Sequence, residues 1–588
     1  MRPNRPAKYP MTAAVSNSSG TPNPSAVADC DSLRSLREYR LFQAAAVATV
    51  VLGCAILFSL NLVDPDLWGH VKYGQDAIAE RALPQTATHT YTAPEHPWIN
   101  HENIAELTFA VVYEFFGTLG LTLGKCLVGM GILGVMAVAA RRRGAGPLVT
   151  WTFLLLVTLN LATFFPVRPQ LLSFALCALA MFVLDRAFAE WPTQAAPKLG
   201  WLWCLPPLVV VWVNSHGAFV AGLCILLTYL GGRAVEMLYY RRAAAWKDAA
   251  HVALVGLACA AGVLVNPYGL DLPRWLAYSL GRPRPEITEW AAPSPSDPVF
   301  VPFVLLVGVF VLSTLLDRRR RDWTHIVILA LVAWQAATHV RHIAFFAILC
   351  GFWLPMPVCG LVSRLRGSAP RDLPEIVLAP WLRRGLIGTL VLVFGLQTYA
   401  LANRLYTLPV YRNMYPVDAV EFLAAHGLRG RLVVAFNWAQ YAVAALSPEV
   451  QVQFDGRFRT CYPQEVIDQH FDFLLGEHEG RRFRSEKSGP IDGRAVLSVG
   501  QPDLILVDRS YPASVEHMEQ EVREHPGRWV LLYQDGVAQL YGRSERYDNP
   551  AGPQYVPPSE RIVTNETRTD FVPWPALPDR TMSRFALK

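Results

Sequence analysis

The sequence has few charged residues for its length, and this shortage decides the broad class of the protein. Asp, Glu, Lys and Arg make up 17% of the 588 residues, whereas soluble proteins average about 25%. The net charge of +6 is too small to indicate a nucleic-acid partner, and the chain carries no motif typical of DNA or RNA binding. Hydrophobic residues reach 52%. This composition excludes a soluble multidomain enzyme, a coiled coil and a disordered scaffold.

Cysteine pairs and nucleotide-binding motifs are missing as well. Of the ten cysteines, eight lie in or beside apolar segments and Cys30 lies near the N-terminus, which leaves Cys461 alone in the polar C-terminal part. We therefore expect no disulfide framework and no Cys-x-x-Cys metal site outside the membrane. The chain has no G-x-G-x-x-G and no P-loop, and Ala105 stands where His-Glu-x-x-His needs its second histidine. A nucleotide site and a zinc metalloprotease are both unsupported.

What the sequence has instead is a series of long apolar segments. A helix that crosses roughly 30 Å of hydrocarbon needs about 20 apolar residues. The segments predicted to cross are 41–63, 121–140, 147–165, 170–188, 199–213, 218–239, 252–265, 300–316, 324–337, 343–362 and 386–400. We therefore predict a polytopic α-helical protein with about 11 transmembrane helices, integral to the plasma (inner) membrane.

Basic residues between these segments set the orientation, because Lys and Arg next to membrane spans are retained in the cytoplasm. The basic clusters fall at 34–40, 141–143, 241–247, 318–321 and 364–371. All lie on one side if residues 104–117, which include Glu106 and Glu114, form a juxtamembrane helix and do not cross. The N-terminus is then cytoplasmic, and everything after residue 400 is extracytoplasmic. Residues 1–40, rich in Pro and Ser, are predicted to be a disordered arm without a cleavable signal peptide.

The opposite side collects most of the unusual polar clusters. They are residues 64–103, 167–169, 214–217, 266–298 and 339–342. Polar and ionisable groups at membrane depth are expensive and usually mark a pathway or a site. We therefore predict a single catalytic face on the extracytoplasmic side, in a membrane domain over residues 41–402 whose first external loop is 64–120.

The pattern changes to that of a soluble α/β domain at residue 403. Short apolar runs typical of strands occur at 432–436, 450–454, 504–507, 529–533 and 537–541. Helical patterns at 417–426, 464–475 and 515–524 separate some of them. This alternation predicts a small sheet flanked by helices over residues 403–545. Residues 546–588 are Pro-rich and are predicted to form an irregular tail.

Acidic side chains of the first external loop are the first candidates for chemistry. Asp64 and Asp66 directly follow the first apolar segment, and His101 and Glu102 lie further along the same loop. Two carboxylates held at a membrane surface can coordinate a divalent ion, or one can act as a general base. The alternative is a solvated loop that begins with an Asp-Pro turn.

A second group is cationic. Arg168, His339, Arg341 and His342 are all predicted at the outer ends of membrane spans. Such charge can hold a phosphate group, and arginine offers a fixed bidentate fork for it. The alternative is snorkelling towards lipid headgroups. The two histidines, three residues apart, can share a metal or simply lie at the interface.

Other polar and aromatic residues on this side leave two interpretations open. Ser215 and His216 are adjacent and do not suit a serine nucleophile, so we expect hydrogen bonding to the hydroxyls of a substrate or a plain loop. The tryptophans predicted outside can stack on a ring or an apolar chain of a substrate, or simply lie at the membrane interface. They are Trp68, Trp98, Trp290 and Trp438.

Two motifs of the first external loop resemble those of a known superfamily. Residues 64–70 read D-P-D-x-W-x-H and residues 97–102 read P-W-x-x-H-E. From about residue 41 to 541 the chain resembles a bacterial group of the GT-C superfamily of membrane glycosyltransferases, which carries this pair. Further stretches match as well, namely Arg168-Pro169-Gln170, Asn214-Ser215-His216-Gly217, Asn266-Pro267-Tyr268-Gly269, Ile287-Thr288-Glu289-Trp290, Tyr415-Pro416-Val417 and Asp455-Gly456-Arg457. The combination is far more specific than any single stretch.

The resemblance implies a GT-C-like fold and an inverting transfer of sugar from a polyprenyl-phosphate-linked donor to a glycan, lipid or protein acceptor. Its essential acidic residue falls on Asp64 or Asp66, as general base or metal ligand. A weaker likeness to the oligosaccharyltransferase catalytic subunit implies that Glu289 supplies a further carboxylate. That subunit's W-W-D-Y-G signature corresponds here to residues 437–441, which contain the Trp and the Tyr but no Asp.

The residues expected to bind substrate or phosphate are His70, His101, Glu102, Arg168, His216, Arg341, Trp438 and Tyr441. The candidate metal ligands are Asp64, Asp66 and Glu289. A single-phosphate donor can be handled by arginine alone, whereas a diphosphate donor favours Mg²⁺ or Mn²⁺.

Two other functions remain open at this stage. A transporter or flippase of lipid-linked substrate predicts polar residues near mid-membrane and paired repeats, and no convincing repeat is visible in the sequence. A GT-C-fold assembly protein without activity is the second, and Gly69 and the missing Asp in residues 437–441 favour it.

Overall fold

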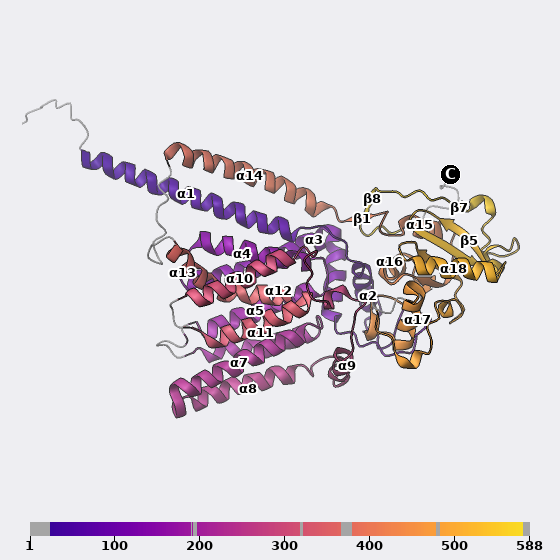
Figure 1. Ribbon diagram of the computed structural model, residues 1–588, viewed down its shortest axis with the longest axis horizontal. Coiled ribbons are helices and arrows are strands. Elements are labelled where there is room, and N and C mark those ends of the chain that lie inside the picture. Colours follow the sequence, from indigo (N-terminus) through magenta and orange to yellow (C-terminus); the bar gives the residue numbers. More distant parts are fainter. Residues whose placement is uncertain are drawn as a thin grey trace, which may run out of the picture.

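The computed structural model describes residues 24–189, 191, 197–317, 321–365, 379–477 and 482–579. A bundle of helices forms one end of an elongated molecule, and a sheet-containing C-terminal region forms the other (Figure 1). Residues 1–23 of the expected disordered arm lie outside the described residues. Helix α1 (Pro24–Phe58) begins within that arm, so residues 24–40 are helical and continue into the first apolar segment.

The bundle consists of apolar helices that run side by side (Figure 1). Besides α1 they are α3 (Asn103–Arg142), α4 (Pro147–Leu161), α5 (Gln170–Ala187), α6 (Leu205–Val213), α7 (Phe219–Arg241), α8 (Trp246–Gly262), α10 (Phe300–Leu316), α11 (Trp323–Thr338), α12 (Ile343–Trp353), α13 (Pro355–Leu365) and α14 (Pro380–Tyr406). Their facing sides form a continuous hydrophobic core.

Six stretches of the described residues are long and apolar enough to cross a membrane, or seven if the bent pair Val340–Trp353 and Pro355–Leu365 is one span. The expected number of about 11 is therefore not confirmed. One stretch, Phe219–Gly262, contains both α7 and α8, which turn back on each other at Arg242. Three further apolar helices are shorter than a full span: Leu199–Val213, Phe300–Leu316 and Trp323–Thr338.

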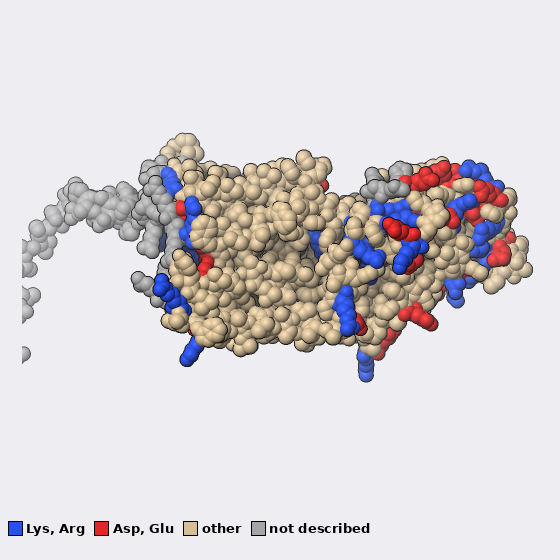
Figure 2. All heavy atoms as spheres, turned by 60° about the horizontal axis from the view of Figure 1, so that its bottom comes forward, with Lys and Arg blue, Asp and Glu red and all other residues tan. Residues whose placement is uncertain are grey.

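Charged side chains mark the ends of the bundle. Figure 2 shows Lys and Arg at the end far from the C-terminal region, and a surface nearly free of charge between that end and the C-terminal region. Ion pairs at the far end join different helices, for example Arg143 with Asp185, and Arg233 with Asp322 at 2.7 Å. An uncharged belt of this kind is what a bilayer requires. The chain is a multi-pass membrane protein.

Helix α3 is broken at Gly117, whose φ of 59° and ψ of −155° are not helical. A residue with a side chain rarely adopts this backbone conformation, so glycine permits the break. The part before Gly117 contains the stretch predicted as a juxtamembrane helix, and it packs against helix α2 (Leu67–Glu80). The part after it belongs to the bundle.

The C-terminal region is built on a six-stranded sheet with the order β3-β2-β4-β6-β5-β7. Strand β2 is parallel to β3 and β4, and β6 is antiparallel to β4 and β5. The strands are β2 (Gly430–Val434), β3 (Val450–Val452), β4 (Leu504–Asp508), β5 (Trp529–Gln534), β6 (Ala538–Arg543) and β7 (Ile562–Val563), and the helices around them are α15 (Val417–Ala425), α16 (Phe436–Leu446), α17 (Gln464–Leu475) and α18 (Pro512–Glu524). Five strands coincide with the predicted apolar runs, whereas α16 was not predicted as a helix.

The last described residues wrap back over this region. Strand β8 (Phe571–Pro573) pairs with β1 (Pro409–Tyr411), and Trp574 is buried. Residues 546–579, for which we expected irregular structure, thus contribute two short strands. An extended backbone suits a Pro-rich segment, and burial of the tryptophan holds it on the protein.

Candidate active site

A cavity of about 380 Å³ lies at the junction of the helical bundle and the C-terminal region. This volume is within the usual range of ligand pockets. Its walls come from the first external loop with α2, the loop before α5, residues 216–221, helix α9 (Asp271–Leu280), residues 284–290 and 341–345, and residues 440 and 456–460. Segments far apart in the sequence therefore meet at one site.

Arg168 is the hub of the acidic end of this cavity. Its Nε lies 3.2 Å from Asp64 Oδ2, and its Nη2 lies 2.9 Å from Asp66 Oδ2. Its Nη1 lies 3.0 Å from Glu289 Oε1. The three carboxylates expected to bind a metal thus each bind one edge of a single guanidinium. Whether they also hold an ion stays a prediction.

The two aspartates have different positions in this arrangement. The Asp66 backbone N–H donates to Asp64 Oδ1 at 3.0 Å, which forms a turn directly before α2. Asp64 is buried behind that turn, whereas Asp66 lines the cavity. Asp66 is therefore the aspartate that a substrate can contact, and Asp64 holds both Asp66 and Arg168 in place.

Burial and charge act against each other in this cluster. Burial raises the pKa of Asp64 to about 6, although Arg168 opposes the rise. Burial also disfavours charge on Arg168, yet Asp64, Asp66 and Glu289 outweigh it and raise the pKa of the guanidinium. Arg168 therefore stays charged at every physiological pH.

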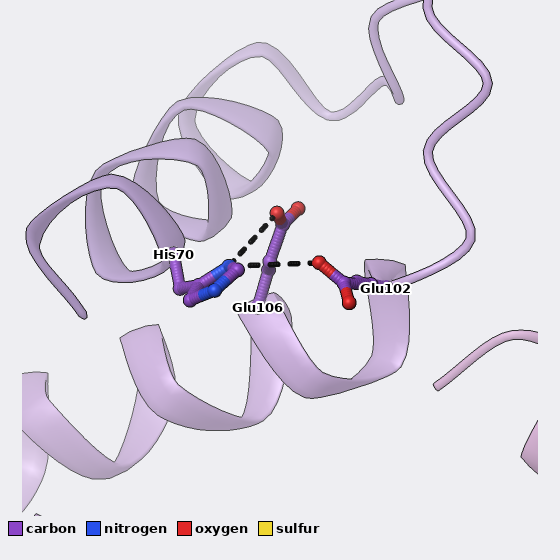
Figure 3. Close-up of side chains that lie close together, drawn as sticks. All are labelled: His70, Glu102 and Glu106. Atoms are coloured by element: carbon purple, nitrogen blue, oxygen red, sulfur yellow. Dashed lines mark hydrogen bonds and ion pairs between the residues drawn. The ribbon is translucent and has the colours of Figure 1, made fainter. Parts of the chain in front are cut away.

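A second cluster joins α2 to the start of α3 (Figure 3). His70 Nδ1 lies 3.4 Å from Glu106 Oε1 and 4.0 Å from Glu102 Oε2. Asn100 Nδ2 donates to the other oxygen of Glu106 at 2.7 Å. Burial lowers the pKa of His70, but the two glutamates outweigh this effect and raise it to about 9. The imidazole is therefore a cation between two carboxylates.

Two more predicted histidines lie on the same wall. His216 Nε2 is 3.8 Å from Glu102 Oε1, and its Nδ1 is 3.0 Å from the Ser173 hydroxyl. Burial is the main cause that lowers the pKa of His216, so this ring is neutral at pH 7. His101 lines the cavity with its ring 5.4 Å from that of Trp275.

Another part of the cavity wall is cationic. The guanidinium of Arg341 lies 4.5 Å from the centre of the Trp290 ring, and that of Arg284 lies 4.7 Å from the same ring. Arg459, from η6 (Phe458–Thr460), lines the cavity as well. Arg341 was predicted at the site, whereas Arg284 and Arg459 were not. No single motif marked them, since each depends on which loops the fold brings together.

Trp438 and Tyr441 do not reach the cavity. The Trp438 indole donates to the carbonyl oxygen of Met414 at 3.0 Å, and the Tyr441 hydroxyl donates to that of Ala576 at 2.6 Å. Both rings are buried in the core of the C-terminal region. Their polar atoms are thus used within the chain, and we assign them a packing role.

Gln440, between those two residues, lines the cavity in their place. Its amide lies between Gly69 and Gly456, where an added Cβ would come within 2.1 Å and 2.7 Å of it, respectively. Glycine at position 69 is therefore required by this contact. Gln440 Oε1 is buried and has no hydrogen-bond partner among the described residues.

The remaining predicted histidines and tryptophans differ in whether they reach the cavity. His342 lines the cavity, and His339 Nδ1 lies 2.9 Å from the Thr338 hydroxyl. The two rings are 5.9 Å apart. Trp98 and Trp290 line the cavity, whereas Trp68 is packed between Tyr415 and Tyr441.

Comparison with known proteins finds likeness in structure only. No protein-family model matches the chain, and no curated protein sequence matches it. Among solved structures, the oligosaccharyltransferase of Archaeoglobus fulgidus tethered with an acceptor peptide matches 85% of this chain and 74% of its own, at 12% identity and a TM-score of 0.50. The archaeal oligosaccharyltransferase AglB from the same organism, in complex with an inhibitory peptide and a dolichol-phosphate, matches 82% and 72%, at 11% identity and a TM-score of 0.50.

ArnT from Cupriavidus metallidurans bound to undecaprenyl phosphate matches 88% of this chain and 98% of its own, at 11% identity and a TM-score of 0.45. The similarity to the oligosaccharyltransferases identifies the fold. The chain shares the fold of these oligosaccharyltransferases, in agreement with the GT-C-like fold that the resemblance implied.

Proposed function

We propose that this protein is a membrane glycosyltransferase that transfers a sugar from a polyprenyl-phosphate-linked donor to an acceptor on the extracytoplasmic face. The observation that carries the proposal is the meeting of Asp64, Asp66 and Glu289 on Arg168 at one cavity. These residues come from three separate loops. Transfer from an anionic donor requires a carboxylate that the acceptor can reach and positive charge that holds the donor. The cavity provides both.

Asp66 is the proposed general base. In an inverting transfer the acceptor hydroxyl oxygen forms a bond to the anomeric carbon, and the bond from that carbon to the phosphate oxygen breaks. The acceptor proton passes to the Asp66 carboxylate, and the electron pair of the broken bond leaves on the phosphate. Arg168 and Asp64 are positioning residues, because they hold the Asp66 carboxylate towards the cavity.

Arg341 is the proposed contact for the donor phosphate. Its guanidinium lines the cavity and makes no ion pair with any described carboxylate. Arginine stabilises a phosphate leaving group as negative charge develops on it. The A. fulgidus enzyme of similar fold is described in complex with a dolichol-phosphate and with peptides. A polyprenyl lipid and an acceptor are the corresponding partners proposed here.

A divalent ion also suits a second set of residues, beside Asp64, Asp66 and Glu289. Ligands about 2.1 Å from an octahedral ion lie roughly 3.0 Å from their neighbours. Among the described residues, the ligand atoms of His70, Glu102 and Glu106 form one group with all distances within 4.8 Å. We therefore propose these residues as metal ligands, with Mg²⁺ or Mn²⁺ as candidates. Because a ligating imidazole is neutral, a bound ion would displace the proton that His70 otherwise holds. A bound ion would add positive charge beside the donor phosphate.

The proposed orientation follows from the charges at the two ends. The end of the bundle far from the C-terminal region carries the basic side chains (Figure 2), and basic ends of spans are retained in the cytoplasm. The cavity and the C-terminal region then face the extracytoplasmic side.

The proposal is tested with purified full-length protein in lipid nanodiscs and radiolabelled polyprenyl-linked sugars. We expect Asp66→Asn to lower transfer or sugar release by about 100-fold or more, the usual contribution of a general base. Asp271→Asn is the matched control, because Asp271 is exposed at the start of α9. Thermal unfolding checks that both variants fold.

Unchanged turnover in Asp66→Asn would remove the catalytic role of this residue. Movement of labelled substrate across vesicles without a covalent product would instead support a transporter. Absence of both activities with every donor tested would support an assembly protein that has the fold alone.

A further inference from the structure

The cationic wall of the cavity carries three arginines whose charges are not neutralised by ion pairs. Arg284, Arg341 and Arg459 all line the cavity, and among the described residues none of them lies within 4.0 Å of a carboxylate oxygen. Arg168 and Arg457, on other walls, are each paired with aspartate. Arg459 is buried, and Arg284 and Arg341 are partly buried. Arginines that are withdrawn from water without a carboxylate partner are costly, so this group indicates a site built for an anion.

The hydrogen bonds of these arginines leave donors free. Arg459 is 7% exposed, and its Nη1 is buried without a partner. Its Nη2 donates to the carbonyl oxygen of Pro283 at 3.0 Å, which fixes the guanidinium beside Arg284. Arg284 donates through Nη2 to the carbonyl oxygen of Ser279, and its Nε is buried without a partner. Donors held in place in this way are preorganised for phosphate oxygens.

The net charge of the arginines and nearby carboxylates indicates the charge of the anion. The three arginines supply three positive charges, and Glu286 offsets one of them beside Arg284 and Arg459. Arg282 and Asp468 also act on Arg459, and their opposite charges cancel. Glu289 is bound to Arg168 and belongs to the acidic end. The excess on this wall is therefore two positive charges. A lipid-linked sugar monophosphate carries one negative charge, and a lipid-linked sugar diphosphate carries two.

We infer that the donor is a polyprenyl-diphosphate-linked sugar, whose diphosphate is held by Arg284, Arg341 and Arg459. This inference rests on the proposed function. As the bond between the anomeric carbon and the phosphate oxygen breaks, the electron pair stays on the diphosphate, which leaves as polyprenyl diphosphate with one further negative charge. The acceptor proton goes to Asp66. The arginines thus bind the donor and stabilise the leaving group.

The role of Arg459 also gives the C-terminal region a part in donor binding. Arg459 extends from η6 of that region, whereas Arg284 and Arg341 belong to the membrane domain. The diphosphate then bridges the two parts of the molecule. Donor binding is expected to tighten the junction between them.

Binding of polyprenyl phosphate and polyprenyl diphosphate of equal chain length to the full-length protein tests the inference without any need for transfer. Dissociation constants are measured in nanodiscs at constant ionic strength. We expect wild type to bind the diphosphate at least 10-fold more tightly than the monophosphate. Arg459→Gln and Arg284→Gln should each weaken diphosphate binding about 10-fold or more and largely remove the preference. Arg459→Lys, which keeps the charge, should lose less.

Arg274→Gln is the matched control, because Arg274 is 73% exposed on α9 and pairs with Asp271. It should leave both constants unchanged. Equal affinity of wild type for the two lipids would overturn the inference, and so would an equal loss of both affinities in Arg459→Gln. The Asp66→Asn variant should keep the preference for diphosphate, so failure of the proposed base and failure of this inference give different results.

Discussion

Arg168 organises the acidic end of the cavity through the geometry of its guanidinium. Its planar fork presents N–H groups along three edges, and a different carboxylate binds each edge. A lysine has one ammonium group and cannot bridge three separate loops in this way. The position of Asp66 thus depends on a residue 102 positions later in the chain.

Gly456 is the residue whose replacement tests the position of Asp66 most directly. A Cβ at Gly456 would lie 2.2 Å from Asp66 Oδ1 and 2.7 Å from Gln440 Nε2. We therefore expect Gly456→Ala to displace the Asp66 carboxylate and to lower transfer about 10-fold or more, with little loss of folding. Initial rates measured with saturating donor check this.

Gly281→Ala is the control for that substitution, because a Cβ there meets carbonyl oxygens at ordinary contact distances of 3.6 Å and 3.8 Å. Wild-type rates in Gly456→Ala would contradict the assignment of Asp66 as the residue that contacts the acceptor.

His470 predicts how the C-terminal region responds to acid. It is fully buried on α17, its Nδ1 lies 2.8 Å from Gln453 Oε1, and burial lowers its pKa to about 3. Because the unfolded chain takes up a proton near pH 6.5 and the folded chain does not, stability falls as pH falls below about 6.5. We expect a loss of about 2 kcal/mol between pH 7.5 and pH 5.

Hydrogen exchange of the amides in β2, β3 and β4 at several pH values measures this loss. The dependence on pH should weaken in His470→Gln, and it should persist in His525→Gln, which alters a histidine on the surface. An equal dependence in wild type and His470→Gln would show that another group controls acid stability.

At the scale of elements, helix α2 is held from several sides. The first arm of α3 packs against it, α16 contacts it through Gly69, and the end of the chain covers its N-terminus. The Trp68 indole donates to the carbonyl oxygen of Pro575 at 2.8 Å. Since α2 begins directly after Asp66, its position decides where the carboxylate points.

Trp574 anchors the end of the chain over α2, and its removal is expected to loosen this element. It is 3% exposed and packs near Trp68 and Tyr113. Trp574→Ala should lower the free energy of unfolding by about 3 kcal/mol, as is usual for a large buried side chain. Phe571→Ala should cost less than about 1 kcal/mol, because Phe571 is 49% exposed.

Denaturant unfolding of the full-length protein in detergent measures both values. A similar cost for the two variants would mean that the buried indole does not hold the segment in place.

At the scale of the whole molecule, the cavity exists only where two parts meet. Arg457 of the C-terminal region lies between the rings of Tyr73 and Trp98, with 4.6 Å to the centre of each. Its guanidinium also binds Asp455 and the carbonyl oxygen of Thr88. This contact fixes residues 456–460 against the first external loop. Neither part alone encloses the site.

Local patterns were enough to predict much of this architecture. Apolar runs indicated a membrane protein, and alternating short strands and helices indicated the C-terminal sheet, because burial in lipid or in a core acts on each segment separately. The motif around Asp66 and the predicted arginines Arg168 and Arg341 likewise pointed to the face where the cavity lies. The number of helices was not confirmed, since hairpins and short helices do not follow the length rule for a single span.

Only the tertiary structure decided what those residues contact. Three contacts join residues that are distant in the sequence. Three carboxylates bind Arg168, Gln440 lies between two glycines, and Arg284, Arg341 and Arg459 line one cavity. Side-chain composition states which charges a chain carries, but electrostatic pairing acts over a few ångströms. Which charge is neutralised and which is left for a substrate is therefore a property of the folded molecule.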